Sequence, residues 1–315
     1  MAWPLIKNLP TETHFRFVRL APFAAILSAI AVAVSGWSFF TTGLNLGTDF
    51  AGGTLIEIET PGPAPLGDLR AKLVAMGAHD PQVQGFGKPQ SAMLRFKPDA
   101  KQDAGAATNA VKAKLSSEFP GIKFKRTDVV GPKVSAELFR SGFMALGIAI
   151  GLMLLYIWFR FQLQFGLGAV LAIFHDVILT IGLLSLTRVE FSMTSIAALL
   201  TIIGYSMNEK VITFDRLREN LRKYKKAPLR EIIDRSENER LSRTLITGST
   251  ALLALAGMLF LGGPTLFPLI FAMVFGIIIG TYSSIYVALP VILLWGVRRG
   301  DEDATPIKPM TPARR

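Results

Sequence analysis

The chain contains six long runs of apolar residues, and each is long enough to cross a lipid bilayer as a helix. A helix rises about 1.5 Å per residue, so roughly 20 residues span the hydrocarbon core. Inside lipid every backbone N–H and C=O needs a partner within the protein, and a helix supplies it. The runs are Ala21–Phe40, Leu138–Phe159, Leu163–Leu186, Met193–Phe214, Leu245–Leu261 and Leu266–Val297. The sequence therefore predicts an α-helical polytopic membrane protein with six spans, of which the last five form a bundle over residues 138–297.

Basic residues indicate which ends of these spans face the cytoplasm. Lysine and arginine gather in the cytoplasmic loops of membrane proteins. The short loops around Arg188–Glu190 and Gly262–Pro264 contain a single arginine, whereas residues 1–20, the loop 215–242 and the tail 298–315 hold most of the basic side chains outside the region 41–137. Both termini are thus predicted to be cytoplasmic. The formal charge of +11 reflects this topology and does not indicate a nucleic-acid site.

One part of the loop 215–242 has its own pattern. Leu229, Ile232, Ile233 and Ser236 follow a helical spacing, with charged residues on the other face. This predicts a short amphipathic helix lying on the membrane surface, where basic residues also bind anionic lipids. The tail 298–315 mixes charge with proline and is predicted to be disordered.

The composition excludes several kinds of chemistry. The chain has no cysteine, which rules out disulfide and cysteine–metal chemistry. The three histidines, His14, His79 and His175, are scattered, which argues against a histidine metal site. No metal, cofactor or enzymatic activity is expected.

Between the first two runs, residues 41–137 are much less hydrophobic and predict a small separate domain. Its elements are a strand at Thr54–Glu59, a helix at Leu66–Met76, strands at Asp80–Phe86 and Ala92–Lys97, a helix at Asp103–Phe119 and a strand at Phe124–Val130. This β-α-β-β-α-β order is typical of the ferredoxin-like arrangement. Because the first span runs outward, the domain is predicted to lie on the far side of the membrane. It is predicted to bind or move, because it contains no clustered catalytic residues.

A glycine-rich turn, Gly43–Gly53, precedes the first strand of this domain. Glycine clusters can hold phosphate, but that function needs a strand before the loop and a helix after it. Here the order is span, loop and strand, which disfavours a nucleotide site.

The fourth apolar run carries Asn208, Glu209 and Lys210 before it ends at Phe214. A charge at mid-membrane costs about 2.5–3.5 kcal/mol on insertion scales, so such residues indicate a function. Neighbouring residues on a helix point about 100° apart, and Glu209 and Lys210 therefore need separate partners. The alternative is that Lys210 extends to the headgroups while Glu209 balances its charge.

Four further ionisable residues could take part. Arg243 begins the fifth run at a depth where its guanidinium could meet Glu209, or it could simply extend to the membrane surface. His175 and Asp176 form the deepest ionisable pair, which either relays protons or fixes helix packing by hydrogen bonds. Asp215 marks the place where water is expected to begin.

Two pairs of glycines have the small-xxx-small spacing of close helix contacts. They are Gly147 with Gly151 and Gly276 with Gly280. Both pairs predict helix packing.

Several stretches together resemble the SecF family of the bacterial SecD–SecF protein-export complex. The matching stretches are Gly47–Gly53, Val130–Val134, Phe174–Val177, Gly204–Asn208, Phe214–Asn220, Leu241–Thr244 and Gly280–Tyr286. Within them, the residues to which the resemblance gives a structural role are Gly47, Asp49, Gly52, Gly53, Gly204 and Tyr205. They lie in order along nearly the whole chain, with the same six-span layout.

The resemblance implies a membrane part of the resistance-nodulation-division type in the bacterial inner membrane. It would pair with SecD, engage the emerging polypeptide in the periplasm and use the proton gradient to promote movement through SecYEG. The family's coupling residues would correspond to Asn208, Glu209, Lys210 and Arg243. The family usually has Asp followed by Thr after this Asn, so the Glu209–Lys210 pair departs from it and leaves sodium as an alternative coupling ion.

Two other functions are compatible with the sequence. A small-molecule exporter of the same type would need a polar cavity with its own substrate residues. A non-transporting scaffold, holding SecD and the channel together, would tolerate neutral residues at Glu209 and Arg243.

Overall fold

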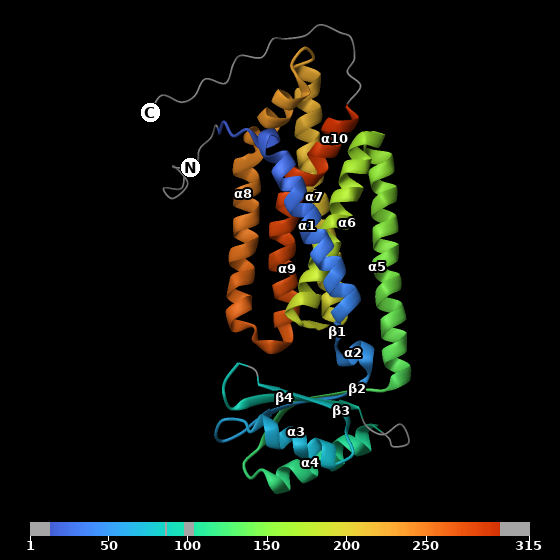
Figure 1. Ribbon diagram of the computed structural model, residues 1–315, viewed down its shortest axis with the longest axis vertical. Coiled ribbons are helices and arrows are strands. Elements are labelled where there is room, and N and C mark those ends of the chain that lie inside the picture. The colour runs from blue at the N-terminus through green and yellow to red at the C-terminus, as the bar shows by residue number, and fades with distance from the viewer. Residues whose placement is uncertain (1–12, 86, 98–103, 297–315) are drawn as a thin grey trace.

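The computed structural model describes residues 13–85, 87–97 and 104–296, so the predicted tail and most of the N-terminal segment lie outside the described residues. Figure 1 shows a bundle of long helices with a small sheet domain at one end. The bundle consists of α1 (Phe17–Thr42), α5 (Pro132–Arg160), α6 (Leu163–Thr187), α7 (Met193–Lys223), α8 (Leu229–Leu261) and α9 (Gly263–Ser283), which continues through the π-helical segment η2 (Ser284–Ala288) into α10 (Leu289–Trp295).

Five of the described helical segments are long and apolar enough to cross a membrane: α1, α5, α6, α8 and Thr265–Trp295. The predicted helical membrane fold is confirmed. α7 is not among the five, since Asn208, Glu209 and Lys210 interrupt its apolar run. The count of six spans therefore stays a prediction.

The bundle has inner and outer helices. In their most apolar windows, 61% of the residues of α6 are buried, against 17% for α1 and for α5 and 11% for α8. Large apolar side chains such as Trp37, Phe40 and Leu253 are exposed on these outer helices. Exposed apolar side chains are expected on a protein surface that faces acyl chains, because the acyl chains are themselves apolar. The buried charged side chains lie instead where α6, α7, α8 and α9 contact one another.

The predicted surface helix in the loop 215–242 is wrong. α7 continues to Lys223 and α8 begins at Leu229, so only a short turn separates two long helices. Ile232, Ile233 and Ser236 are buried inside the protein, and their apolar face is therefore not available to lipid. α1 covers this part of α8: the Asp234 carboxylate accepts the Val18 N–H at 2.8 Å.

The small domain has the element order that the sequence predicts. It contains β2 (Gly53–Glu59), α3 (Leu66–Ala75), β3 (His79–Gly85), β4 (Ser91–Lys97), α4 (Ala104–Glu118) and β5 (Lys123–Val130). The strands form an antiparallel sheet in the order β3-β4-β2-β5. α3 and α4 cover the face of the sheet turned away from the bundle (Figure 1). Residues of both helices pack there with Ile56, Leu94 and Phe96 in a core of their own.

The glycine-rich turn connects the small domain to the bundle. Two-residue strands β1 (Asn45–Leu46) and β6 (Glu190–Phe191) pair in parallel, and the one-turn helix α2 (Thr48–Ala51) follows. A Cβ on Gly47 would lie 2.4 Å from the Glu190 Oε1 atom. The Asp49 carboxylate accepts the Met193 N–H at 3.0 Å, which satisfies one of the free N–H groups at the start of α7.

Gly52 and Gly53 end this turn in backbone conformations that other residues rarely adopt, with φ of 67° and 109°. A Cβ on Gly53 would also lie 2.7 Å from the Phe96 carbonyl oxygen. The two glycines thus allow β2 to enter the sheet directly beside β4. The role indicated by the sequence motif is structural.

Two arginines of the sheet contact the bundle. Arg95 on β4 forms a 2.6 Å ion pair with Glu190, and it donates to the Leu46 carbonyl at 3.0 Å. Arg126 on β5 donates to the Thr265 hydroxyl at 2.6 Å. The open face of the sheet is therefore held against the end of the bundle by polar contacts.

Candidate functional site

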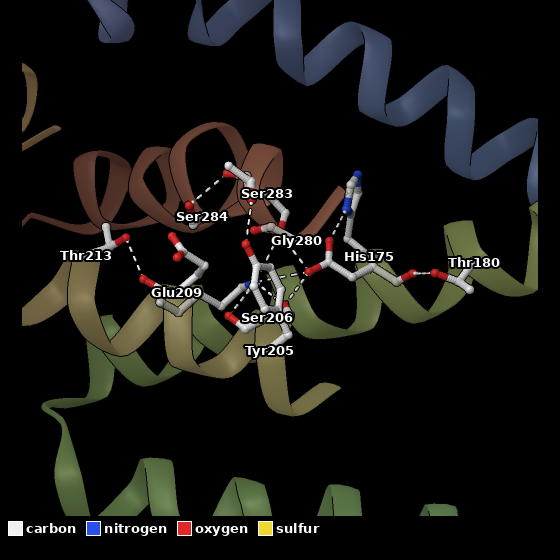
Figure 2. A network of polar contacts seen from close by, with 12 residues as sticks. His175, Thr180, Tyr205, Ser206, Glu209, Thr213, Gly280, Ser283 and Ser284 are labelled. Carbon is white, nitrogen blue, oxygen red and sulfur yellow. Dashed lines mark hydrogen bonds and ion pairs between the residues drawn. The ribbon is translucent and has the colours of Figure 1, made fainter. Parts of the chain in front are cut away.

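A cluster of buried polar side chains lies where α6, α7 and α9 meet (Figure 2). Asp176 is 1% exposed and Lys210 is 0% exposed. The Lys210 Nζ lies 3.0 Å from the Asp176 Oδ2 atom, in an ion pair between α6 and α7. The same oxygen accepts the Ser206 hydroxyl at 2.5 Å and the Ser283 hydroxyl at 2.7 Å. Hydrogen bonds of this kind are needed to keep a buried ion pair stable.

His175 extends this network to α1. Its Nδ1 lies 3.0 Å from the Asp176 Oδ1 atom, and its Nε2 lies 3.2 Å from the Ser28 hydroxyl. The imidazole also stacks on Tyr282 with 6.2 Å between ring centroids. These contacts connect α6 with α1 and α9, and the two roles that the sequence allows for His175 and Asp176, proton relay and helix packing, stay predictions.

A second buried cluster lies between α7 and α8. The Arg240 guanidinium contacts two carboxylates, Glu209 on α7 and Glu237 on its own helix. Its Nε lies 2.9 Å from each oxygen of Glu237, and its Nη1 lies 3.2 Å from the Glu209 Oε2 atom. The Thr244 hydroxyl also donates to that Glu209 oxygen at 3.2 Å. Glu209 and Glu237 are 1% exposed and Arg240 is 4% exposed.

The two clusters follow from helix geometry. Glu209 and Lys210 point about 100° apart, so Lys210 reaches α6 while Glu209 faces α8. Ser206 is one turn before Lys210 and shares its face. Glu237 and Arg240 are three residues apart, which places their side chains next to each other on α8.

Adjacent serines at the end of α9 connect the clusters. The Ser283 hydroxyl donates to Asp176, while the Ser284 hydroxyl accepts the Arg240 Nη2 at 3.1 Å. Ser284 is the first residue of η2. π-helical turns occur mostly within longer helices and often at functional sites.

The contact between Arg243 and Glu209, one of the two alternatives that the sequence allows, is not formed. Arg243 is exposed on α8, and Arg240, one turn earlier, takes the predicted place beside Glu209. Arg240 takes this position because α8 begins at Leu229, well before the apolar run. The face of α8 that is turned inward carries Ile233, Glu237, Arg240 and Thr244. These residues continue one helical stripe at intervals of four, three and four. That spacing is the signal by which Glu237 and Arg240 could have been found.

Other predicted residues lie outside the clusters. Asn208 is exposed. Asp215 is also exposed and pairs with Arg160 at 2.8 Å, at the end of α5. Gly204 is exposed, and the Tyr205 hydroxyl lies 3.3 Å from that of Thr281 on α9. The structure thus separates Asn208, Asp215 and Gly204 from the buried charges, whereas Tyr205 lies near Glu209 and Arg240.

Among the described residues, no group of three or more histidine, aspartate or glutamate side chains is placed to hold a metal ion. The buried groups are instead paired charges and hydroxyls within a helical bundle. The fold and the site define a class: membrane proteins whose spans enclose titratable ion pairs and which carry a small α/β domain at one end.

Comparison with known families identifies the group within this class. Residues 110–298 match the model of "Protein export membrane protein SecD/SecF, C-terminal", and residues 37–60 match the "SecD/SecF GG Motif". The chain belongs to the SecD/SecF family. The GG motif covers the turn that contains Gly52 and Gly53, and the longer match covers both buried clusters.

Similar proteins carry names from the same family. The chain is 42% identical to the protein translocase subunit SecF of Cereibacter sphaeroides, over 94% of each chain. It is 40% identical to SecF of Pseudomonas aeruginosa, over 90% of each. The SecDF crystal structure from Thermus thermophilus, described as a translocon-associated membrane protein, has 33% identity and a TM-score of 0.83. That match covers 91% of this chain but 39% of the longer SecDF chain.

Proposed function

We propose that the chain is an accessory subunit of Sec-dependent protein translocation that acts with SecD and uses the proton gradient. The observation that carries this proposal is the carboxylate of Glu209, buried between helices and sharing one arginine with a second carboxylate. Ionisable side chains inside a membrane domain are costly and mark ion pathways in transporters. SecD is supported as a partner by relatives that are named SecDF, such as one from Brucella abortus of which the chain matches 39%.

The energy available is sufficient for a mechanical role. One charge crossing 100 mV supplies about 2.3 kcal/mol, which shifts a two-state equilibrium roughly fiftyfold. Binding and release of a proton at Glu209 would change how Arg240 is shared between the two carboxylates. The helices that carry these groups could then bias the small domain between two positions as a polypeptide leaves SecYEG. The protein would act as a transport component and not as an enzyme.

The proposal includes a topology in the bacterial inner membrane. α7 also crosses the membrane, which brings the number of spans to six. Both termini are cytoplasmic, and the small domain is ferredoxin-like and periplasmic. Arg222, Lys223 and Arg230 are exposed near the turn between α7 and α8, where they would meet anionic lipids. The absence of cysteine allows a direct test.

We expect that Lys112→Cys in α4 reacts with a membrane-impermeant maleimide in intact spheroplasts. Lys226→Cys, in the turn after α7, should react only after the cells are permeabilised. Lys112 is partly exposed and Lys226 is exposed. Equal labelling of both variants in intact spheroplasts would contradict the topology.

Export measures the function itself. In cells whose own copy is replaced, Glu209→Gln should abolish the stimulation of export of a secreted reporter, because the amide cannot bind and release a proton. Asp215→Asn is the matched control, since it removes an exposed carboxylate from the same helix. Replacing sodium by potassium in the medium should leave export unchanged if the proton is the coupling ion.

The two other functions make different predictions. Normal export by an assembled Glu209→Gln complex would favour a scaffold that holds SecD and the channel together. A small-molecule exporter would require a substrate cavity. The cavity lined by Gln82, Gln84, Arg95 and Glu190, of about 200 Å³, lies between the sheet and the end of the bundle and not among the buried charges.

A further inference from the structure

The buried charges of the bundle do not balance. Among the described residues, its buried carboxylates are Asp176, Glu209 and Glu237, and its buried basic groups are Lys210, Arg240 and the imidazole of His175, which is charged only when protonated. With the His175 imidazole neutral and the other five groups ionised, the set carries one uncompensated negative charge. A net charge enclosed by apolar helices is costly, and one carboxylate is therefore expected to hold a cation.

Asp176 is not the carboxylate that lacks compensation. Its Oδ2 atom forms the ion pair with Lys210, and the Ser206 and Ser283 hydroxyls donate to the same oxygen. Its other oxygen is 3.0 Å from His175. The missing positive charge therefore belongs to the second cluster, where two carboxylates share one guanidinium.

Within that cluster Glu237 has the stronger hold on Arg240. The Arg240 Nε lies 2.9 Å from both Glu237 oxygens, and Nη2 lies 2.5 Å from one of them. Glu209 accepts a hydrogen bond from only one Arg240 nitrogen, Nη1, at 3.2 Å. The same nitrogen also donates to the Thr244 hydroxyl at 2.8 Å. Several parallel contacts to one carboxylate make the strong form of an arginine pair.

We propose that Glu237 is a positioning residue that keeps Arg240 for itself and thereby makes Glu209 the carboxyl group that binds a proton. This inference rests on the proposed function for its role in transport, but its contact geometry is independent of it. The charged and titratable groups around Glu209 are Lys210 and Tyr205 on α7 and Arg240 and Glu237 on α8. Tyr286 of η2 and Asp234 of α8 lie beyond Glu237.

The proton can be located chemically. Dicyclohexylcarbodiimide is an apolar reagent that enters membranes and modifies protonated carboxyl groups, and mass spectrometry identifies the modified residue. We expect modification of Glu209 but not of Glu237 in the full-length protein reconstituted in lipid vesicles. Modification of Glu237 instead of Glu209, or of neither, would overturn the proposal.

Variants of Glu237 then test the positioning role. Glu237→Gln releases Arg240 to Glu209, and modification of Glu209 should fall about tenfold, because a hydrogen bond to a charged group stabilises the ionised form by at least that factor. Glu237→Asp keeps the charge and should keep the modification. Glu239→Gln is the control, since Glu239 pairs with Arg216 and Arg235 and not with Arg240. Unchanged modification in a folded Glu237→Gln protein contradicts the proposal.

If Glu237→Gln does not fold, Arg240→Lys provides the opposite change. Lysine has no planar fork and cannot hold two carboxylates in this geometry, so modification of Glu209 should increase severalfold. A decrease would contradict the proposal. Labelling needs neither SecD nor export. If only the proposed function is wrong, Glu209 will still be the residue that is modified. If only this inference is wrong, the modified residue will differ although the protein still stimulates export.

Discussion

Replacing Lys210 with methionine is expected to destabilise the folded protein by about 3–5 kcal/mol, the cost of removing one partner from a buried ion pair. Methionine fills a similar volume but cannot neutralise Asp176, which is 1% exposed in the interior of the bundle. The Ser206 and Ser283 hydroxyls can still donate to the carboxylate, but they carry no charge. The free energy of unfolding in mixed detergent micelles measures the loss.

The double variant Asp176→Asn with Lys210→Met should recover most of this free energy. Replacing both partners of a buried pair is often neutral or stabilising, since no charge remains to be compensated. Arg160→Gln provides the matched control, because it breaks the pair with Asp215 at the exposed end of α5. Exposed pairs contribute at most about 1 kcal/mol. A Lys210→Met loss no larger than that of Arg160→Gln would show that Asp176 does not depend on Lys210.

The sequence predicts the small domain and the helical fold well because their signals are local. β4 alternates buried and partly buried residues along its length, as a sheet with one covered face requires. Glycine-rich turns and apolar runs likewise indicate structure without reference to distant residues. For this reason the element order of the domain and the membrane class agree with the structure.

The partners of the buried charges could not be predicted in the same way. Arg240 and Arg243 are three residues apart, so their side chains point about 60° apart around α8. A small rotation of the helix decides which one faces Glu209. That rotation is set by packing against α1, α7 and α9, which no local pattern encodes. Here the Asn238 side chain accepts the Phe15 N–H and the Asp234 carboxylate accepts the Val18 N–H, and Arg240 faces inward.

The surface helix was mispredicted for a related reason. An amphipathic stripe such as Ile232 and Ile233 is compatible with a lipid surface or with a protein surface. The sequence carries no signal that separates the two, since it does not show that α1 begins directly beside this part of α8. The structure places both isoleucines in the core of the bundle.

Glycine spacing alone also does not decide which helices pack closely. Only one of the two predicted glycine pairs makes close contacts among the described residues. A Cβ on Gly147 or Gly151 would meet no atom within 4 Å. A Cβ on Gly276 in α9 would lie 2.3 Å from the Ile202 Cγ1 atom of α7, and one on Gly280 would touch Ser206 at 3.4 Å. Gly276 therefore lets α9 approach α7 closely enough for the Ser283 hydroxyl to accept the Lys210 ammonium at 3.0 Å.

Gly276→Ala is accordingly expected to destabilise the protein by about 1–3 kcal/mol, the cost of overpacking a well-filled contact. Gly257→Ala is the control: Gly257 lies in α8 with no atom within 4 Å of an added Cβ, and alanine should stabilise that helix by up to about 1 kcal/mol. The same chemical change should thus have opposite signs at two helical positions in one protein. The free energies of unfolding of the two variants, measured under identical micelle conditions, check this.

A further substitution tests whether the close contact is the cause. Ile202→Ala removes the atoms that an added methyl group would meet, so Gly276→Ala should cost much less in the Ile202→Ala background than in the parent protein. The export assay adds a second readout, because a displaced α9 moves Ser283 and Ser284 away from both ion pairs. If Gly276→Ala destabilises the protein equally in both backgrounds, the contact between an added methyl group and Ile202 is not the cause.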